Sequence, residues 1–343
     1  MMEQYVDQIP DDLAAAFDWC LEHELTDGLP VVPPSRRLIE AMVERGRREA
    51  AEVLGRLAPS NQEFTVLDLA VNAVMAGCLP DYFPVVLAAA EAMLDPRFRA
   101  GEVQATSRPC GPMIIVNGPI AKRLGIEHFN HCFGSGFRAN ATIGRSLRLV
   151  LMNLGGGRPG RGDAAAFGWP GKISFCWAEN EDPKLNPWEP LHVERDFSPE
   201  ESAVTVAAVN GYYNCSGGRP SVAEAMRMFG FSMSNATDHL LWHGQPILVM
   251  GIEKAGMMRQ AGITKGEAKR LLFEQAQAPA SALSDEVLLE LKKSRMDLNP
   301  SGMLSVADSA EDIILAVAGG WGPHSVFLPT LPSSQAVTKK IME

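Results

Sequence analysis

The sequence predicts an α/β protein in which helices cover both faces of a parallel or mixed sheet. One observation is that short apolar runs ending in glycine turns alternate with helix-like segments along the chain. A second is that residues 112–126 and 246–263 share one plan, in which a proline, an apolar run, a glycine and a helix start follow one another. A third is length, because 343 residues, of which 46% are hydrophobic, can build a large core.

The shared plan favours two pseudo-repeated halves. We expect an N-terminal half with helices and an α/β part, residues 1–160, and a C-terminal α/β half, residues 161–343. The glycine-rich segment 155–172 would be the seam between them. One compact domain is the alternative, because strand-turn-helix units also recur in single α/β domains.

Several helices can be placed in order along the chain. Apolar side chains recur at helical spacing in residues 13–21, and a second helix should begin after Ser35. Residues 64–78 and 82–94 favour two buried helices, each either core or subunit interface. Residues 140–157 favour a long helix that ends in three glycines.

Four apolar runs read as strands, and each ends in a polar or glycine-rich turn. In open α/β sheets, ligands bind outside the carboxyl ends of the strands. If the four strands are parallel, their turns open on one edge. We therefore expect the substrate-binding residues there or beside it: Asn117, Gly118, Arg138, Asn210, Gly217, Arg219, Gly320 and Ser325.

The loop after the apolar run 204–209 is the richest candidate for catalysis. It holds Tyr212, Tyr213, Asn214 and Cys215, and a cysteine thiolate is a strong nucleophile when a cation or helix end lowers its pKa. His324, in the last glycine-rich turn, suits a general acid or base. The alternative is that Cys215 only fills a turn.

A second cluster suggests a metal site. His128, His131 and Cys132 lie close together in the sequence, and imidazole with thiolate is a ligand set for zinc or iron. A satisfied histidine at a buried helix end is the alternative. The nearby Gly134-Ser135-Gly136 could instead bind an anion through backbone N–H groups.

Other cofactors have no signal in the sequence. The chain carries no phosphate-binding loop, no complete dinucleotide fingerprint and no G-x-S-x-G elbow, so nothing indicates ATP, NAD or PLP, and nothing indicates a serine triad. The acidic segment 178–202, with Trp188 and His192, is either disordered or a lid over a site.

Charge and composition narrow the partners. A formal net charge of −10 without a dense basic run argues against nucleic acid and anionic membranes. We see no signal peptide, no run long enough to span a bilayer and no C-x-x-C pair. We therefore expect a soluble, cytoplasmic protein with reduced thiols, which binds a small molecule and forms a homo-oligomer.

The stretches AVNGYYNCSGGRPSVAEAM and AVAGGWGPHSVFLPTL…AVTKKI resemble a bacterial group of proteins and selenoproteins named for its UGSC motif. The resemblance implies a strand that runs into a reactive cysteine and is followed by a helix. It covers about a fifth of the chain. This sequence departs from a reductase pattern at Asn214-Cys215-Ser216-Gly217, because no second cysteine stands beside Cys215.

Three functions follow from these patterns. The first is an enzyme, a lyase or oxidoreductase, that transforms a small organic substrate, with Cys215 as nucleophile or redox thiol, His324 as acid or base and Tyr212 or Tyr213 as a donor to developing charge. The second is a metalloenzyme with a His/His/Cys site that binds zinc or iron. The third is a non-catalytic subunit that binds a small ligand.

Overall fold

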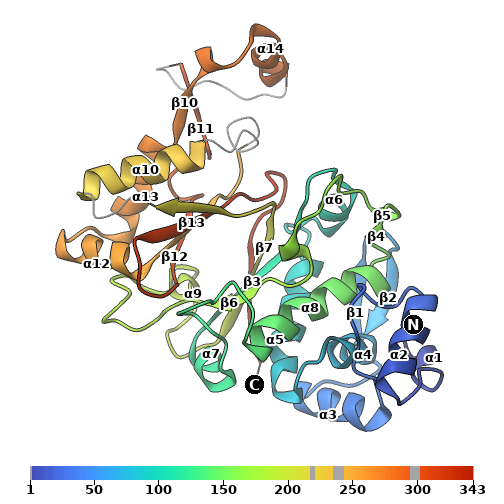
Figure 1. The fold of residues 1–343 in the computed structure, drawn as a ribbon. Coiled ribbons are helices and arrows are strands. Elements are labelled where there is room, and N and C mark those ends of the chain that lie inside the picture. The colour runs from blue at the N-terminus through green and yellow to red at the C-terminus, as the bar shows by residue number, and fades with distance from the viewer. Residues whose placement is uncertain (1, 217–220, 235–242, 294–301, 343) are drawn as a thin grey trace. The chain divides into compact units, whose positions relative to one another are not determined.

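The computed structural model describes residues 2–216, 221–234, 243–293 and 302–342 (Figure 1). The chain forms two compact units. The first unit comprises Met1–Ala178, His192–Ala208 and Ala336–Glu343, and the second comprises Glu179–Leu191 and Val209–Gln335. The expected boundary between residues 160 and 161 therefore falls inside the first unit.

The first unit combines helices with a four-stranded sheet of order β14-β7-β3-β6. Its helical segments are α1 (Glu3–Val6), α2 (Leu13–Glu22), α3 (Arg36–Gly46), α4 (Val66–Ala76), η1 (Pro80–Tyr82), α5 (Phe83–Leu94), α6 (Ala100–Ala105), α7 (Pro119–Leu124), α8 (Arg138–Asn153) and η2 (Pro170–Lys172). Its strands are β1 (Val53–Leu57), β2 (Gln62–Thr65), β3 (Gly111–Asn117), β4 (Arg158–Pro159), β5 (Gly162–Asp163), β6 (Cys176–Ala178), β7 (Ala203–Val209) and β14 (Val337–Lys340). The short helix α9 (Leu191–Glu194) begins where the chain returns to this unit.

The second unit is built on a sheet of order β12-β9-β13-β8. Its helices are α10 (Val222–Ser234), α12 (Ile252–Gln260), α13 (Lys265–Gln275), η3 (Ala280–Ala282) and α14 (Asp285–Lys293). Its strands are β8 (Tyr213–Ser216), β9 (Ile247–Met250), β10 (Gln277–Pro279), β11 (Met303–Ser305), β12 (Ile314–Val317) and β13 (His324–Leu328).

The predicted α/β class with mixed sheets is confirmed. Strands β3 and β6 are parallel, as are β9 and β12, whereas β13 runs antiparallel to both β8 and β9. Every residue of β3 and of β7 is buried, which is typical of strands whose sheet is covered on both faces. The four predicted strands do not share one edge, however, because β3 and β7 belong to one sheet and β9 and β12 to the other.

The buried helices of the first unit form where the sequence predicts them. Helix α4 begins with a capping box, in which the Thr65 hydroxyl accepts a hydrogen bond from the Asp68 amide at 3.3 Å and the Asp68 carboxylate accepts one from the Thr65 amide at 3.0 Å. Helices α4 and α5 are buried almost throughout. Helix α4 packs against α8, which is itself buried along most of its length. Among the described residues, no helix has the length and apolar character needed to cross a membrane.

The acidic segment 178–202 is ordered. The Trp188 indole donates a hydrogen bond to the Ile263 carbonyl at 2.9 Å inside the second unit. His192, which belongs to the first unit, is fully buried. Both predicted lid residues are therefore packed side chains in this structure.

Candidate functional site

Four of the five predicted catalytic residues lie on two paired strands of the second unit, and Tyr212 directly precedes one of them. Strands β8 and β13 are antiparallel, with Ser216 opposite His324 and Cys215 opposite Ser325. Asn214 and His324 are both exposed, and the Asn214 Nδ2 atom lies 3.2 Å from His324 Nδ1. The structure thus brings an amide and an imidazole together on the open face of this sheet.

Cys215 lies on the other face of the same strands. Side chains alternate along a strand, so Cys215 and Ser325 point away from the face that carries Asn214 and His324. Cys215 is only 2% exposed. Burial raises the pKa of its thiol, and hydrogen bonds from Ser232 of α10 and the Phe327 backbone offset this only in part. Cys215 and His324 therefore do not face one common point in this structure.

Tyr213 and Ser325 have structural partners in this unit. Tyr213 stacks on Phe327, with ring centroids 6.0 Å apart, and Tyr212 is exposed. The buried Ser325 hydroxyl accepts a hydrogen bond from the Gly251 amide at 3.2 Å.

The sequence predicts four other substrate-binding residues in this unit. The Asn210 side-chain amide donates to the Thr330 carbonyl at 3.0 Å. Gly320 is half-buried in the turn after β12. Gly217 and Arg219 lie outside the described residues.

Three predicted substrate-binding residues belong to the first unit instead. Arg138 donates two hydrogen bonds, of 3.1 and 3.0 Å, to the Gly77 carbonyl at the end of α4, so its guanidinium caps that helix. Asn117 is fully buried at the end of β3. Gly118 packs closely against the backbone of Glu201 and Ser202, because a Cβ there would lie 2.2 Å from the Glu201 carbonyl oxygen.

The predicted metal ligands do not form a metal site. The segment that carries His128, His131 and Cys132 consists of turns, so these residues do not share a helix face. His131 is exposed and Cys132 is buried. Within the described part of the chain, no three His, Cys, Asp or Glu side chains gather as metal ligands would.

A pocket of about 230 Å³ lies elsewhere in the first unit, where the sequence did not suggest one. Four charged side chains line it together with apolar ones. The lining residues are Asp27, Arg148, Met152, Pro159, Asp163, Ala165, Phe167, Gly168, Trp169, Lys172 and Ile173.

The charged part of the wall is a triad of buried ions. Asp163 accepts a hydrogen bond from Arg148 at 3.0 Å and another from Lys172 at 2.8 Å. The side chains of Asp163, Arg148 and Lys172 are only 4%, 9% and 10% exposed. Burial acts to raise the pKa of Asp163, but the Lys172 ammonium and, less strongly, the Arg148 guanidinium hold it below its usual range. Asp163 is therefore ionised, and two cations share one carboxylate.

Local backbone structure brings these ions together. Arg148 projects from the middle of α8, while Asp163 ends β5, which pairs with β4. Strand β5 begins with glycine at residue 162, where φ is +86° and a Cβ would lie 2.3 Å from the Gly156 carbonyl oxygen. Lys172 ends the short helix η2.

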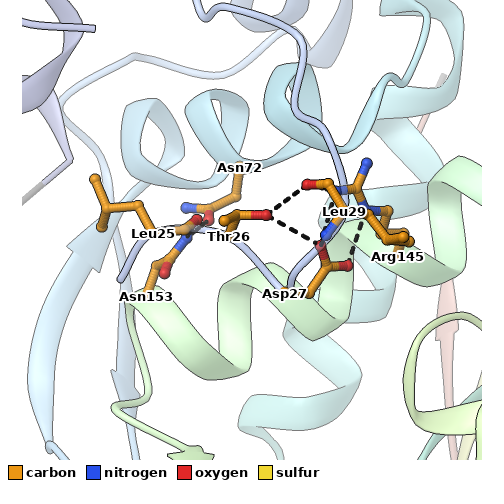
Figure 2. A network of polar contacts seen from close by, with 7 residues as sticks. All are labelled: Leu25, Thr26, Asp27, Leu29, Asn72, Arg145 and Asn153. Carbon is orange, nitrogen blue, oxygen red and sulfur yellow. Dashed lines mark hydrogen bonds and ion pairs between the residues drawn. The ribbon is translucent and has the colours of Figure 1, made fainter. Parts of the chain in front are cut away.

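A second ion pair stands at the same pocket (Figure 2). Arg145, one turn before Arg148 on α8, donates two hydrogen bonds to the Asp27 carboxylate, at 2.8 and 2.7 Å. The same guanidinium donates to the Leu29 carbonyl at 3.0 Å, and the Thr26 hydroxyl donates to that oxygen at 2.6 Å. This bidentate contact fixes the Asp27 carboxylate and its loop, and the Arg145 guanidinium neutralises the charge of Asp27.

The same loop is anchored at its other end. Asn153, at the end of α8, donates to the Leu25 carbonyl at 3.0 Å and to the Asn72 side-chain oxygen at 2.9 Å, as Figure 2 shows. Asn72 belongs to α4, so both central helices of the unit hold residues 25–29. The wall of the pocket that carries Asp27 is therefore pre-organised.

One sequence signal could have located this site. Arg148 interrupts the apolar run Leu147–Met152, and a charge in such a run must find a partner if the helix is buried. Its partner Asp163, and Lys172, which shares the Asp163 carboxylate, come from the segment that the sequence predicts as a seam between halves.

Comparisons with protein-family models, with curated proteins and with solved structures found no match.

Proposed function

We propose that this protein binds a small organic anion in the pocket of its first unit. The observation that carries the proposal is the buried triad at the pocket wall. Arg148 and Lys172 bring two positive charges, and Asp163 neutralises only one of them. The Asp27 charge is already paired with Arg145, so one positive charge is left over beside the pocket.

A surplus buried charge is unfavourable without a counter-ion. Arginine and lysine are also the side chains that bind carboxylates and phosphates most directly. In the described structure Arg148 makes one hydrogen bond, to Asp163, although a guanidinium carries five N–H donors. An anion in the pocket would complete both the charge balance and the hydrogen bonding of this wall.

Calorimetric titration of the full chain with acetate, benzoate and inorganic phosphate tests the proposal. We expect saturable binding of one anion per chain by at least one of these probes. Lys172→Met should weaken that binding at least tenfold. The matched control is Arg161→Met, between β4 and β5, because the Arg161 side chain is 67% exposed, does not line the pocket and pairs with Glu24. No binding by the native chain, or equal losses in both variants, would overturn the proposal.

A second candidate is the small-molecule enzyme with Cys/His chemistry that the sequence predicts. The contact between Asn214 and His324 favours it, because an amide beside the ring can fix the orientation of a histidine that transfers protons. Cys215 would have to leave its buried position to take part. Turnover of a small organic substrate that is lost in both His324→Asn and Cys215→Ser would support this candidate, and turnover that survives both changes would exclude it.

The cysteines support a reducing compartment for either function. All six are free and buried. We therefore propose that the protein acts in the cytoplasm, where thiols are kept reduced.

A further inference from the structure

The non-ionic part of the pocket narrows the class of anion. Besides Gly168 and the four charged residues, six residues line the pocket. Their side chains are apolar, except that Trp169 also carries an indole N–H. These residues are Met152, Pro159, Ala165, Phe167, Trp169 and Ile173. A pocket that combines these charged groups with such a lining fits a ligand with one ionic end and an apolar body.

The volume sets the size of that body. At about 230 Å³ the pocket lies below the roughly 300–1,000 Å³ typical of sites for drug-sized ligands, so a small body fits it. The single surplus charge matches one carboxylate. Two carboxylates would bring a second negative charge next to Asp163 and Asp27.

Aromatic side chains at the pocket indicate that the body is flat. The Phe167 side chain lines the pocket and yet is 98% exposed. Trp169 is held in place by an edge-to-face contact with Phe175, with ring centroids 5.6 Å apart. Its indole Nε1 atom is buried and has no hydrogen-bond partner among the described residues. A ligand ring that covers a fully exposed phenylalanine buries a large apolar area, which favours binding. Aromatic rings also pack against each other in specific geometries.

We propose that the pocket takes an aromatic monocarboxylate of the size of benzoate. Its carboxylate binds Arg148 and Lys172, and its ring lies against Trp169 and under Phe167. This proposal rests on the proposed function, because it names the ligand class of the same site.

The test compares ligands that differ in one property at a time. The probes are benzoate, benzamide, cyclohexanecarboxylate and acetate, each titrated calorimetrically into the full chain. Benzoate should bind most tightly. Benzamide, which lacks the charge, should bind at least tenfold more weakly, and the non-planar cyclohexanecarboxylate should bind several-fold more weakly.

A variant isolates the aromatic contact from the charged one. Phe167→Ala removes an exposed side chain and should leave the fold intact, while benzoate affinity falls about tenfold and acetate affinity stays unchanged. Phe231→Ala is the matched control, because Phe231 is also exposed, at 64%, but lies in the second unit. It should change neither affinity.

Two kinds of failure are distinguishable. If acetate or cyclohexanecarboxylate binds as tightly as benzoate, or if Phe167→Ala leaves benzoate affinity unchanged, the aromatic assignment is wrong while the anion site stands. If none of the carboxylates and no inorganic phosphate binds, both the assignment and the proposed function are wrong.

Discussion

Replacing Asp163 by asparagine tests the buried triad directly. The two side chains are nearly equal in volume, so the change removes a charge without opening a cavity. It leaves Arg148 and Lys172, which are 9% and 10% exposed, without their shared carboxylate. Removing one partner of a buried ion pair typically costs about 3–5 kcal/mol. We expect about 3 kcal/mol here, the lower end, because both cations also face the pocket.

Hydrogen exchange measures this cost where it arises. Amides of α8 (Arg138–Asn153) report the opening of the first unit, since this helix is buried in it and carries Arg148. A loss of 3 kcal/mol corresponds to about 150-fold faster exchange. The control is Asp7→Asn. Asp7 pairs with Arg36, and both side chains are more than half exposed, so the loss there should be about 0–1 kcal/mol.

One result would refute this reasoning. If exchange in α8 quickens no more for Asp163→Asn than for Asp7→Asn, the carboxylate does not hold the two cations in the folded protein. The surplus positive charge that we infer beside the pocket would then have no support.

Three further predictions concern acid stability, the reactivity of a thiol and a glycine substitution. Because its pKa is lowered in the folded state, Asp163 contributes stability that is fully present above the ordinary carboxyl pKa of about 3.9. This contribution is lost as the pH falls through the lowered pKa. Acid titration should therefore destabilise Asp163→Asn less than the native chain. Cys215 should resist iodoacetamide at pH 8 until urea unfolds the protein, since its thiol is buried with a raised pKa; rapid labelling of the folded chain would contradict this. Gly118→Ala should cost about 2–3 kcal/mol in urea unfolding, because φ is +86° and the Cβ would meet the Glu201 carbonyl, whereas Gly125→Ala, with φ +64° and open space, should cost less.

The fold class and most buried helices could be predicted because they depend on local patterns. Residues 66–76 and 83–94 form α4 and α5 where the apolar pattern placed helices. The partition of strands between two sheets could not be predicted in the same way. Strand β14 (Val337–Lys340) pairs with β7 (Ala203–Val209) across more than a hundred residues, and no local pattern encodes such a pairing.

In the candidate sites, too, local patterns could be predicted and tertiary arrangement could not. The sequence singled out Asn214 and His324, which do come together, but it could not tell that Cys215 faces away, since one step along a strand reverses the direction of a side chain. The pocket was missed for a different reason. Asp27, Arg148 and Lys172 come from a loop, a helix and a short 3₁₀ turn, and only tertiary structure brings them together.

The order in which the first unit is assembled has a consequence for biosynthesis. Its sheet contains β14, whose residues are synthesised after the whole second unit. During synthesis, one edge of β7 (Ala203–Val209) therefore stays unpaired while well over a hundred further residues are added. An open strand edge invites pairing with another chain. We expect that a nascent chain arrested before residue 337 would depend on chaperones, and that a version with β14 transplanted ahead of residue 1 would escape this delay.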